Sequence, residues 1–414
     1  GVGHPRSVHV QRQRTAAYRN LTQPTADHHP LDASIAGEQC QGSAGVCRKA
    51  DLVTAAIAAV AKEHGVETET LTASEPELWI YNPVLVEPWQ GPTVLAWRFE
   101  VTPIELAPIR QLVLVDAHRG AIVLSYNQLD TAKNRLTYTA NNTTSLPGTL
   151  VCNESNPNCT GGDSQAVAAH KYAGHSYDFY STYHGRDSIN NAGMALISTT
   201  HYNMGECNAY WSGSQMVYSH SCNLAVDDVV AHEITHGVTE YEAGLFYFYQ
   251  SGAINESFSD IWGEFIDLTN GDGNDTAGVR WQMGEDSSIG TLRSMSNPPA
   301  FGDPDRIGSA NYYTDTLDNG GVHLNSGVGN KAAYLMTDGG TFNGYTVTGL
   351  GITKVAKIFY EAQTNILTSG SDYYDLGLAL NRACWNLIGT SGITSSNCNE
   401  VSDATQAVEM FSQP

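Results

Sequence analysis

Two histidines and a glutamate stand at a spacing that suits a metal ion. His232, Glu233 and His236 form the pattern His-Glu-x-x-His. In a helix, residues four apart lie on one face, so both imidazoles can bind a single tetrahedral zinc ion. Glu233 would then lie beside the metal, where its carboxylate can accept a proton from a water molecule that the ion activates. The pattern also arises by chance in unrelated chains, so the assignment requires a third ligand elsewhere.

A second segment, residues 252–260, supplies that ligand. It reads as the start of another helix, and Glu256 lies twenty residues after His236, which is enough chain for a helix end, a turn and a return. Asp260 is one helical turn beyond Glu256 and therefore shares its face. A metal-bound histidine usually donates its other ring N–H to a carboxylate. We therefore expect Glu256 to bind the metal and Asp260 to accept a hydrogen bond from one of the histidines.

A third segment, residues 317–327, contains Asp318 and His323 and completes a recognisable set. HEITH, GAINESFSD and DNGGVHLNSG, in this order, resemble the thermolysin family of zinc endopeptidases. Further matching segments carry the resemblance over residues 136–414; they are residues 208–211, 214–218, 293–296 and 302–305. The resemblance implies an α+β, two-lobed fold. Its β-rich lobe would span residues 131–242 and end in the HExxH helix, and its α-helical lobe would span residues 243–414.

The resemblance also implies roles for the residues around the metal. Zinc would lie on His232, His236 and Glu256, with Glu233 as the base. His323, oriented by Asp318, and Tyr247 would stabilise the negative charge that develops on the substrate oxygen. For Tyr247 there is a simpler alternative, because Phe248 and Tyr249 follow it and such a run is typical of a hydrophobic core.

Six other positions match those that hold the substrate in the family. Asn208 and Ala209 would bind the substrate backbone, and Arg293 would bind a substrate carbonyl. The pocket for the residue after the scissile bond would be lined by three apolar residues, Val229, Leu292 and Met283. Their apolar character predicts a preference for a hydrophobic side chain after the scissile bond. Each residue also has a purely structural interpretation. Asn208 and Ala209 could belong to an ordinary edge strand, Arg293 could be a surface charge, and the three apolar residues could be part of the core.

Calcium is also expected, although the pattern departs from the family here. Two acidic positions of the family's paired calcium site are Arg280 and Gln282 in this chain. We therefore expect one calcium ion rather than two, or a salt bridge from Arg280 in its place. The acidic loop 270–275 resembles a calcium loop in composition, but polar turns look the same. The candidate calcium ligands are Asp228, Asp267 and Glu285.

Composition narrows the class of protein. The chain has 414 residues, 41% hydrophobic residues and a formal net charge of −22. The acidic excess argues against nucleic-acid binding, which requires a basic face, and agrees with a secreted protein. No run of eighteen apolar residues occurs, so we expect no membrane span. A monomer that acts on polypeptide substrates fits these features.

The eight cysteines fall into four pairs of near neighbours. An even number at local spacing predicts four disulfides and an oxidising, extracellular compartment. Sequence alone allows 105 connectivities, and the preference for short loops favours neighbours. A zinc ribbon is the alternative, but no Cys-x-x-Cys occurs. The expected pairs are Cys40 with Cys47, Cys152 with Cys159, Cys207 with Cys222, and Cys384 with Cys398.

Residues 1–130 differ in pattern from the rest of the chain. A polar first stretch precedes a predicted helix over 51–65 and strands over 78–86, 94–101, 111–115 and 121–126. This order resembles the end of the pro-region that precedes such proteases, and the polar stretch 128–135 reads as a linker. We therefore expect a zymogen-like chain, in which residues 1–130 cover the cleft and inhibit the enzyme until the linker is cut.

These observations together predict a secreted zinc metalloendopeptidase. The alternative is a catalytically inactive relative that acts as a binding module. Loss of Glu233 or of a zinc ligand would favour that alternative, and all four residues are present.

Overall fold

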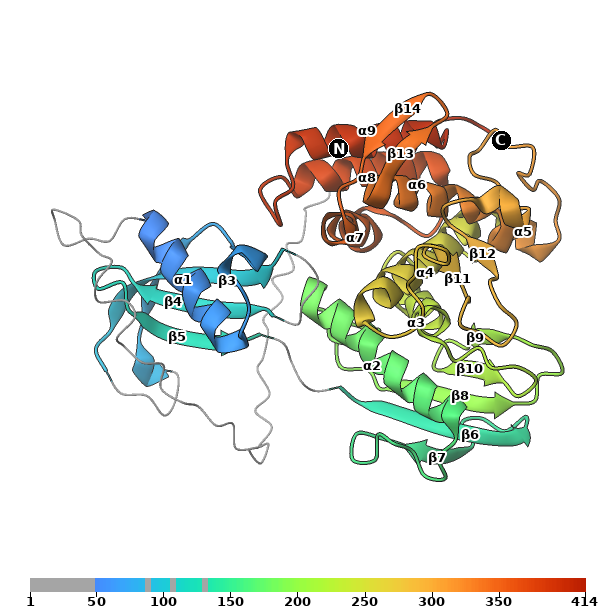
Figure 1. Cartoon of the computed structure of the whole chain (residues 1–414), viewed down its shortest axis with the longest axis horizontal. Helices are drawn as coiled ribbons and strands as arrows, with labels where there is room; N and C mark the ends of the chain where they lie inside the picture. The colour runs from blue at the N-terminus through green and yellow to red at the C-terminus, as the bar shows by residue number, and fades with distance from the viewer. Residues whose placement is uncertain (1–48, 86–90, 105–108, 129–132) are drawn as a thin grey trace, which may run out of the picture.

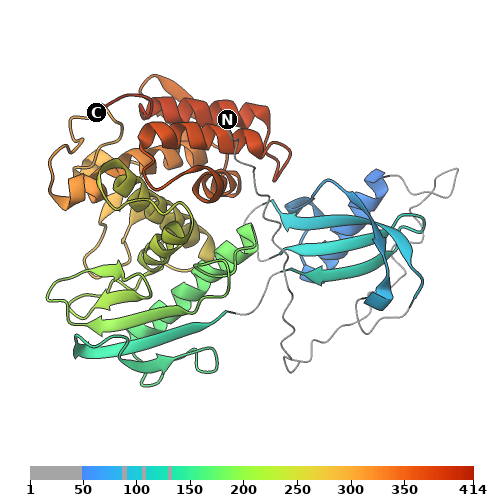
Figure 2. The same ribbon diagram turned by 180° about the vertical axis from the view of Figure 1, so that it is seen from behind.

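A computed structural model describes residues 49–85, 91–104, 109–128 and 133–414 (Figure 1). The described chain is an α+β protein. A small module lies beside a larger body that consists of a β-rich lobe and a helical lobe, as the view from behind also shows (Figure 2). The expected fold class is confirmed. Of the predicted sequence features, residues 1–48 and the centre of the linker, 129–132, lie outside the described residues.

The small module is one helix on an antiparallel sheet. Helix α1 (Lys49–His64) packs on a sheet of order β1-β3-β4-β5, with β2 pairing on β3. Apolar residues of α1, such as Leu52 and Val60, meet Phe99 and Val113 of the sheet in a common core. The strands are β1 (Leu71–Ala73), β2 (Glu77–Tyr81), β3 (Val94–Pro103), β4 (Gln111–Asp116) and β5 (Ile122–Asn127). Short 3-10 turns cover Thr68–Thr70 and Pro83–Leu85.

The β-rich lobe is a five-stranded mixed sheet covered by helix α2 (Ser164–His184). Asp163 caps this helix by accepting the backbone N–H groups of Gln165 and Ala166, and Gly185 ends it with φ 63°. The sheet order is β7-β6-β8-β10-β9, with parallel pairs β6/β8 and β8/β10. The strands are β6 (Arg135–Thr143), β7 (Thr149–Cys152), β8 (Leu196–Tyr202), β9 (Ala209–Trp211) and β10 (Met216–Ser219).

Two buried helices join the lobes. α3 (Asp227–Tyr241) and α4 (Tyr249–Asn270) pack against each other. They approach closely at Gly263, where a Cβ atom would lie only 2.7 Å from the backbone oxygen of Asp228. α4 starts at Tyr249, before the segment 252–260 that was predicted as its start, because burial of its first turns outweighs the low helix propensity of Gly252.

Further helices form the rest of the helical lobe around a core that includes Phe258, Trp262 and Phe359. α9 begins at Ser395, where Thr394 and Asn397 form a capping box. The helices are α5 (Asp318–Asn325), α6 (Gly327–Asp338), α7 (Ile352–Glu361), which continues as a π turn over Ala362–Ile366, α8 (Tyr373–Asn386) and α9 (Ser395–Ala407). Pro298–Phe301 is a 3-10 turn. Two hairpins pair β11 (Gln282–Met283) with β12 (Arg293–Ser294), and β13 (Gly339–Phe342) with β14 (Tyr345–Thr348).

Three of the four predicted disulfides are present: Cys152–Cys159, Cys207–Cys222 and Cys384–Cys398. The fourth pair, Cys40 with Cys47, lies outside the described residues. Within the described ranges, no helix is long and apolar enough to cross a membrane.

The small module lies next to the C-terminal end of α2 and to α7 (Figures 1 and 2). The Arg110 guanidinium packs against Gly185, where a Cβ atom would collide with it. Lys357 of α7 donates a hydrogen bond to the backbone oxygen of Tyr183 beside this contact. The contact is therefore at the helix end, and the site described below lies elsewhere.

Candidate metal centre and active site

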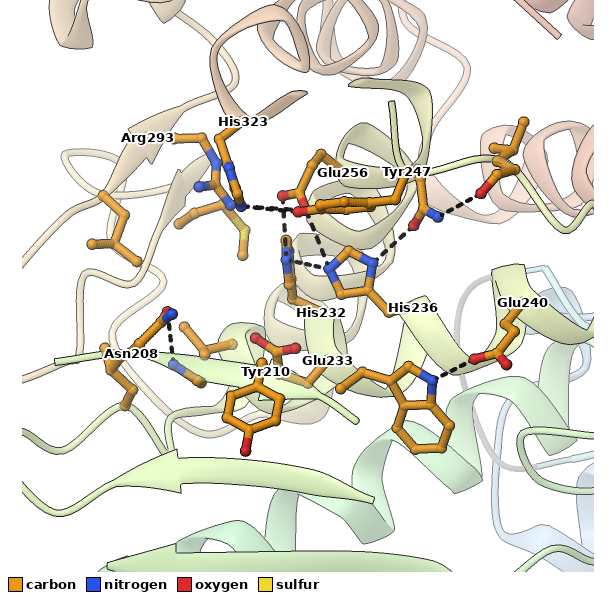
Figure 3. A pocket seen from close by; sticks show the side chains of 18 of the residues that line it. Asn208, Tyr210, His232, Glu233, His236, Glu240, Tyr247, Glu256, Arg293 and His323 are labelled. Carbon is orange, nitrogen blue, oxygen red and sulfur yellow. Dashed lines mark hydrogen bonds and ion pairs between the residues drawn. The ribbon is translucent and has the colours of Figure 1, made fainter. Parts of the chain in front are cut away.

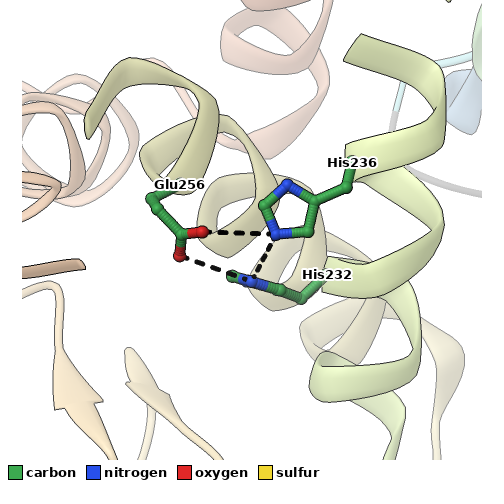
Figure 4. A group of neighbouring side chains, drawn as sticks. All are labelled: His232, His236 and Glu256. Carbon is green, nitrogen blue, oxygen red and sulfur yellow. Dashed lines mark hydrogen bonds and ion pairs between the residues drawn. The ribbon is translucent and has the colours of Figure 1, made fainter. Parts of the chain in front are cut away.

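Helices α3 and α4 bring two histidines and a glutamate to one point (Figure 4). The Nε2 atoms of His232 and His236 lie 3.0 Å apart. The Glu256 carboxylate faces both, with Oε1 at 3.4 Å from His236 Nε2 and Oε2 at 3.6 Å from His232 Nε2. In the described part of the chain, this is the one group of three or more His, Cys, Asp or Glu residues whose ligand atoms all lie within 4.8 Å of one another.

The other ring nitrogens of both histidines are engaged, which fixes the direction of their Nε2 atoms. His232 Nδ1 lies 2.9 Å from Asp260 Oδ1, as predicted. His236 Nδ1 lies 2.8 Å from Asn255 Oδ1 and 3.1 Å from Ser259 Oγ. Neither Asn255 nor Ser259 was predicted from the sequence. Their i, i+4 spacing on the helix of Glu256 was the available signal.

These residues fit a zinc ion. Glu256 is fully buried, and its Oε2 accepts no hydrogen bond from the described residues. Burial alone would raise the pKa of Glu256, but the neighbouring His236, His323 and His232 outweigh burial and lower it to about 2. An ionised carboxylate oxygen without a donor, facing two imidazole nitrogens, is the donor set that zinc prefers.

Glu233 lies on the same helix and lines the pocket beside the histidines (Figure 3). Its side chain is almost completely buried. Burial raises the pKa of Glu233 to about 7, against the opposing effects of His236 and of a hydrogen bond from the Trp211 backbone. A carboxylate with a pKa near neutrality can both accept a proton and return it.

His323, Asp318 and Tyr247 meet on another wall of the pocket. His323 Nδ1 lies 2.6 Å from Asp318 Oδ1, and its backbone N–H donates to Asp318 Oδ2 at 3.0 Å. The Tyr247 hydroxyl lies 3.1 Å from His323 Nε2 and donates to Glu256. Burial disfavours the His323 imidazolium, but Glu256 and Asp318 outweigh burial, so the pKa of His323 is raised. The pocket thus contains two adjacent donors.

A kink at the start of α5 aims His323 at the pocket. Asn319, Gly320 and Gly321 all have positive φ, between 50° and 91°. A Cβ atom at Gly320 would lie 2.5 Å from the Tyr249 ring, so no larger residue fits there without displacement.

Arg293 is bound to the same carboxylate as His232. Its guanidinium donates to Asp260 Oδ2 at 2.8 Å and to Oδ1 at 2.5 Å, and Asn330 Nδ2 donates to Oδ2 at 2.7 Å. Burial raises the pKa of Asp260, but Arg293 and His232 outweigh it, and the net shift is downward. Asn330 is a further partner of Asp260 that was not predicted from the sequence.

The pocket has a volume of about 670 Å³ and contains all six residues predicted to bind substrate. Asn208 and Tyr210 lie on one side of it, opposite Arg293, His323 and Tyr247 (Figure 3). Ala209 belongs to β9, the edge strand of the sheet. The remaining predicted residues that line the pocket are Val229, Leu292 and Met283.

No described residue of the small module lines this pocket. The expectation that residues 1–130 cover the cleft is therefore not met by the described part of the module, residues 49–128. That part contacts the body at the end of α2, through Arg110 and Gly185.

The predicted calcium ligands lie in an acidic region around the ends of α3 and α4. Asp228 accepts the backbone N–H groups of Val229, at 2.6 Å, and of Gly284. Burial and mutual repulsion raise the pKa values of Asp228, Asp267 and Glu285. Asp267 Oδ1 and Glu285 Oε2 are buried and have no hydrogen-bond partner among the described residues.

Arg280 does not replace a calcium ion by a salt bridge within this group. Its guanidinium pairs with Asp338, at 3.1 Å from Nε and 3.0 Å from Nη2. That alternative is wrong, because Asp338 at the end of α6 lies within reach and offers both carboxylate oxygens. The loop 270–275 is tied to α2 by a 2.6 Å ion pair between Asp272 and Lys171.

Comparison with known proteins agrees with this geometry. A family profile described as "Thermolysin metallopeptidase, catalytic domain" matches residues 115–240, and one described as "Thermolysin metallopeptidase, alpha-helical domain" matches residues 243–410. Bacillolysin of Brevibacillus brevis is 38% identical over 85% of this chain and 71% of its own length. Thermostable neutral protease NprT of Geobacillus stearothermophilus is 36% identical over 88% of this chain and 75% of its own length.

A solved structure is similar as well. The precursor of protealysin, a metalloproteinase from Serratia proteamaculans, is 30% identical with a TM-score of 0.56, over 67% of this chain and 88% of its own. The first family match begins inside β4, so the family signature reaches into the small module.

Proposed function

We propose catalytic roles for three residues of this chain, which belongs to the thermolysin family and is a zinc metalloendopeptidase. Glu233, His323 and Tyr247 carry out peptide hydrolysis. They act beside a zinc ion that is held by His232, His236 and Glu256. The observation that carries this proposal is the buried Glu256 carboxylate, which faces the Nε2 atoms of both histidines and whose Oε2 accepts no hydrogen bond from the described residues, with Glu233 on the helix of the histidines. When bound, zinc would acidify a water molecule and polarise the substrate carbonyl.

The protein residues would divide the proton transfers among them. Glu233 accepts the proton of the attacking water and passes it to the leaving amine, a task that its pKa of about 7 suits. His323 and Tyr247 donate hydrogen bonds to the oxygen on which negative charge develops. Asp318 holds the His323 ring in the required orientation and favours the protonated form of His323.

We also propose that the substrate lies extended along β9. An edge strand offers unpaired backbone groups to a peptide, and Asn208 and Ala209 stand at that edge. Arg293 would bind a substrate carbonyl with the N–H groups that Asp260 does not use. Val229, Leu292 and Met283 would receive a hydrophobic side chain after the scissile bond, because burial of apolar surface favours it.

The chain organisation supports a zymogen. In this proposal residues 1–130 are the pro-region, 131–242 the β-rich lobe and 243–414 the helical lobe. The module of α1 and β1 to β5 and the similarity to a protease precursor support the first of these. Latency would end when the linker is cut between about residues 128 and 140, and the released pro-region would inhibit the mature enzyme in trans.

We further propose that the protein is secreted, monomeric and stabilised by calcium. The three disulfides favour an oxidising compartment. For calcium, the support is a group of three mutually repelling carboxylates, the buried Asp228 and Asp267 and the partly buried Glu285. One bound cation would relieve that repulsion.

One experiment tests the catalytic proposal. The purified full chain is incubated with casein, with and without a zinc chelator, and the products of the chain itself are sequenced from their N-termini. Wild type should digest casein only without chelator. The control Glu206→Ala changes an exposed glutamate and should have the activity of the wild type. Glu233→Ala should retain zinc and lose nearly all activity. Equal turnover by Glu233→Ala with zinc bound would refute the assigned base, and an inactive wild type with zinc bound would favour the binding-module alternative.

A further inference from the structure

A second pair of histidines lies outside the pocket that contains the catalytic residues. His201 lies in β8 and His220 directly follows β10, the parallel neighbour of β8 (Figure 1). Their Nδ1 atoms face each other at 3.3 Å. His220 is exposed and His201 is partly exposed, so an ion in solution can reach both nitrogens.

The distance between these nitrogens matches two ligands of one metal ion. Two imidazole nitrogens, each about 2.0–2.1 Å from a tetrahedral zinc ion, lie roughly 3.3 Å apart. The corresponding separation at the catalytic centre, between His232 Nε2 and His236 Nε2, is 3.0 Å. A simple hydrogen bond between the two rings is the alternative explanation, although 3.3 Å is longer than the usual distance for such a bond.

A carboxylate orients the first histidine as it would in a metal site. His201 Nε2 lies 2.9 Å from Asp163 Oδ2. If Nε2–H donates to Asp163, then Nδ1 carries the lone pair that faces His220. This is the arrangement by which carboxylates fix the tautomer of metal-binding histidines. Asp163 is itself held in place, because its Oδ1 accepts the backbone N–H of Gln165 at 3.0 Å in capping α2.

The surrounding backbone is rigid. His201 has a φ of 53°, a conformation that costs a residue other than glycine energy and is kept here by its neighbours. Its N–H donates to Gln165 Oε1 at 3.3 Å, and the Gln165 amide donates to the backbone oxygens of Ser219 and Cys222. The Cys207–Cys222 disulfide closes the segment that bears His220. Both rings are thus presented by fixed elements rather than by a free loop.

We propose that His201 and His220 bind a divalent transition-metal ion, of the class that imidazole prefers, such as Zn²⁺, Ni²⁺ or Cu²⁺. Water would complete its coordination. The ion would hold β8 and the end of β10 together. The segment between these strands contains β9, the strand along which we propose that the substrate lies. Ser219, next to His220, donates its N–H to the backbone oxygen of Asn208 at 3.0 Å, so the site connects directly to the substrate-binding edge.

The test compares Ni²⁺ binding by the zinc-loaded full chain and its variants in isothermal titration calorimetry, with retained zinc checked by elemental analysis. His201→Phe and His220→Phe keep an aromatic ring and remove the nitrogens. His118→Phe, at an exposed histidine of the small module, is the matched control. Apart from these three positions, the histidines are identical in the four proteins. A lower Ni²⁺ stoichiometry in the His201 and His220 variants, but not in the His118 control, therefore reports binding by this pair.

Wild type and His118→Phe should bind one more equivalent of Ni²⁺ than either variant of the pair. Asp163→Asn should keep that equivalent and weaken its affinity roughly 10–100-fold, because the orienting carboxylate is lost. Thermal denaturation monitored by circular dichroism shows whether each variant is folded. Equal stoichiometry and affinity in wild type and in either folded phenylalanine variant would overturn the proposal, because the site requires both imidazoles.

Discussion

Asp260 accepts a hydrogen bond from His232, with 2.9 Å between Oδ1 and Nδ1, although the two residues are 28 positions apart in the chain. The same buried carboxylate holds the Arg293 guanidinium at 2.8 Å. One side chain therefore orients both a proposed zinc ligand and a proposed substrate-binding residue. This link predicts that a change at Asp260 affects metal binding and substrate binding together.

Asp260→Asn tests that link. The amide cannot accept from both His232 and Arg293 as the carboxylate does, so zinc affinity should fall roughly 10–100-fold. KM should rise as well, when measured with zinc in excess. Asn330→Ala removes a different donor to Asp260 and leaves the carboxylate, so it should have the smaller effect on both quantities. Zinc-buffered dialysis and peptide kinetics measure them, and an unchanged zinc affinity in Asp260→Asn would contradict the prediction.

Glu256→Gln should remove the anionic ligand and weaken zinc binding more than Asp260→Asn does. The buried amide of the variant is neutral, so it neither offsets the metal charge nor retains both oxygen donors. Dialysis against a chelator should strip zinc from the variant at lower chelator concentration than from wild type. If both proteins lose zinc at the same concentration, the third ligand lies elsewhere.

His323→Ala and Tyr247→Phe should lower kcat far more than they raise KM. Each removes one donor to the developing negative charge, and loss of one such donor typically costs about 10²–10³-fold in kcat. Tyr241→Phe, at an exposed tyrosine on α3, is the control and should leave both constants unchanged. An effect confined to KM would show that His323 and Tyr247 bind the ground state only.

Stability should decrease as the pH falls below about 6.5, partly because of His184. This residue is partly buried and stacks on Tyr360 at 3.9 Å between ring centroids. Burial, helped by Lys357 and Arg186, lowers the pKa of His184 well below its usual value. Above pH 6.5 the ring is neutral in both states, so it adds no pH dependence. Below that pH only the unfolded chain takes up the proton, which favours unfolding.

His184→Phe keeps the stack on Tyr360 and removes the titrating nitrogens. Its free energy of unfolding, measured with urea between pH 7 and pH 5, should therefore change less steeply than that of wild type. His118→Phe should follow the wild-type curve. Parallel curves for wild type and His184→Phe would mean that His184 is not the group responsible.

Calcium should raise the melting temperature through the acidic group at Asp228, Asp267 and Glu285. Without a cation, burial and then mutual repulsion raise the pKa values of these carboxylates. Asp267→Asn should reduce that repulsion, raise the melting temperature in chelator and abolish most of the calcium effect. Asp403→Asn, in α9, is the control. A calcium effect of the same size in Asp267→Asn would place the ion elsewhere.

The sequence by itself determined the family, the fold class and the residues at the centre of the site. His232 and His236 are predictable because a helix has a fixed period, so residues four apart must share a face. Glu256 and His323 are predictable because their surrounding segments match a family pattern. Helix α2 also has strong local start and stop signals, because Asp163 caps its first turn and Gly185 ends it.

Only the tertiary structure decided contacts between segments that no periodicity relates. Asn255, Ser259 and Asn330 contact the metal-site residues because the packing of α3, α4 and α6 brings them together. The Arg280 guanidinium forms a hydrogen bond with Asp338 rather than with the acidic group, because the end of α6 lies next to it. The small module contacts the end of α2 instead of the pocket for the same reason: docking depends on complementary surfaces in three dimensions, and sequence spacing does not encode them.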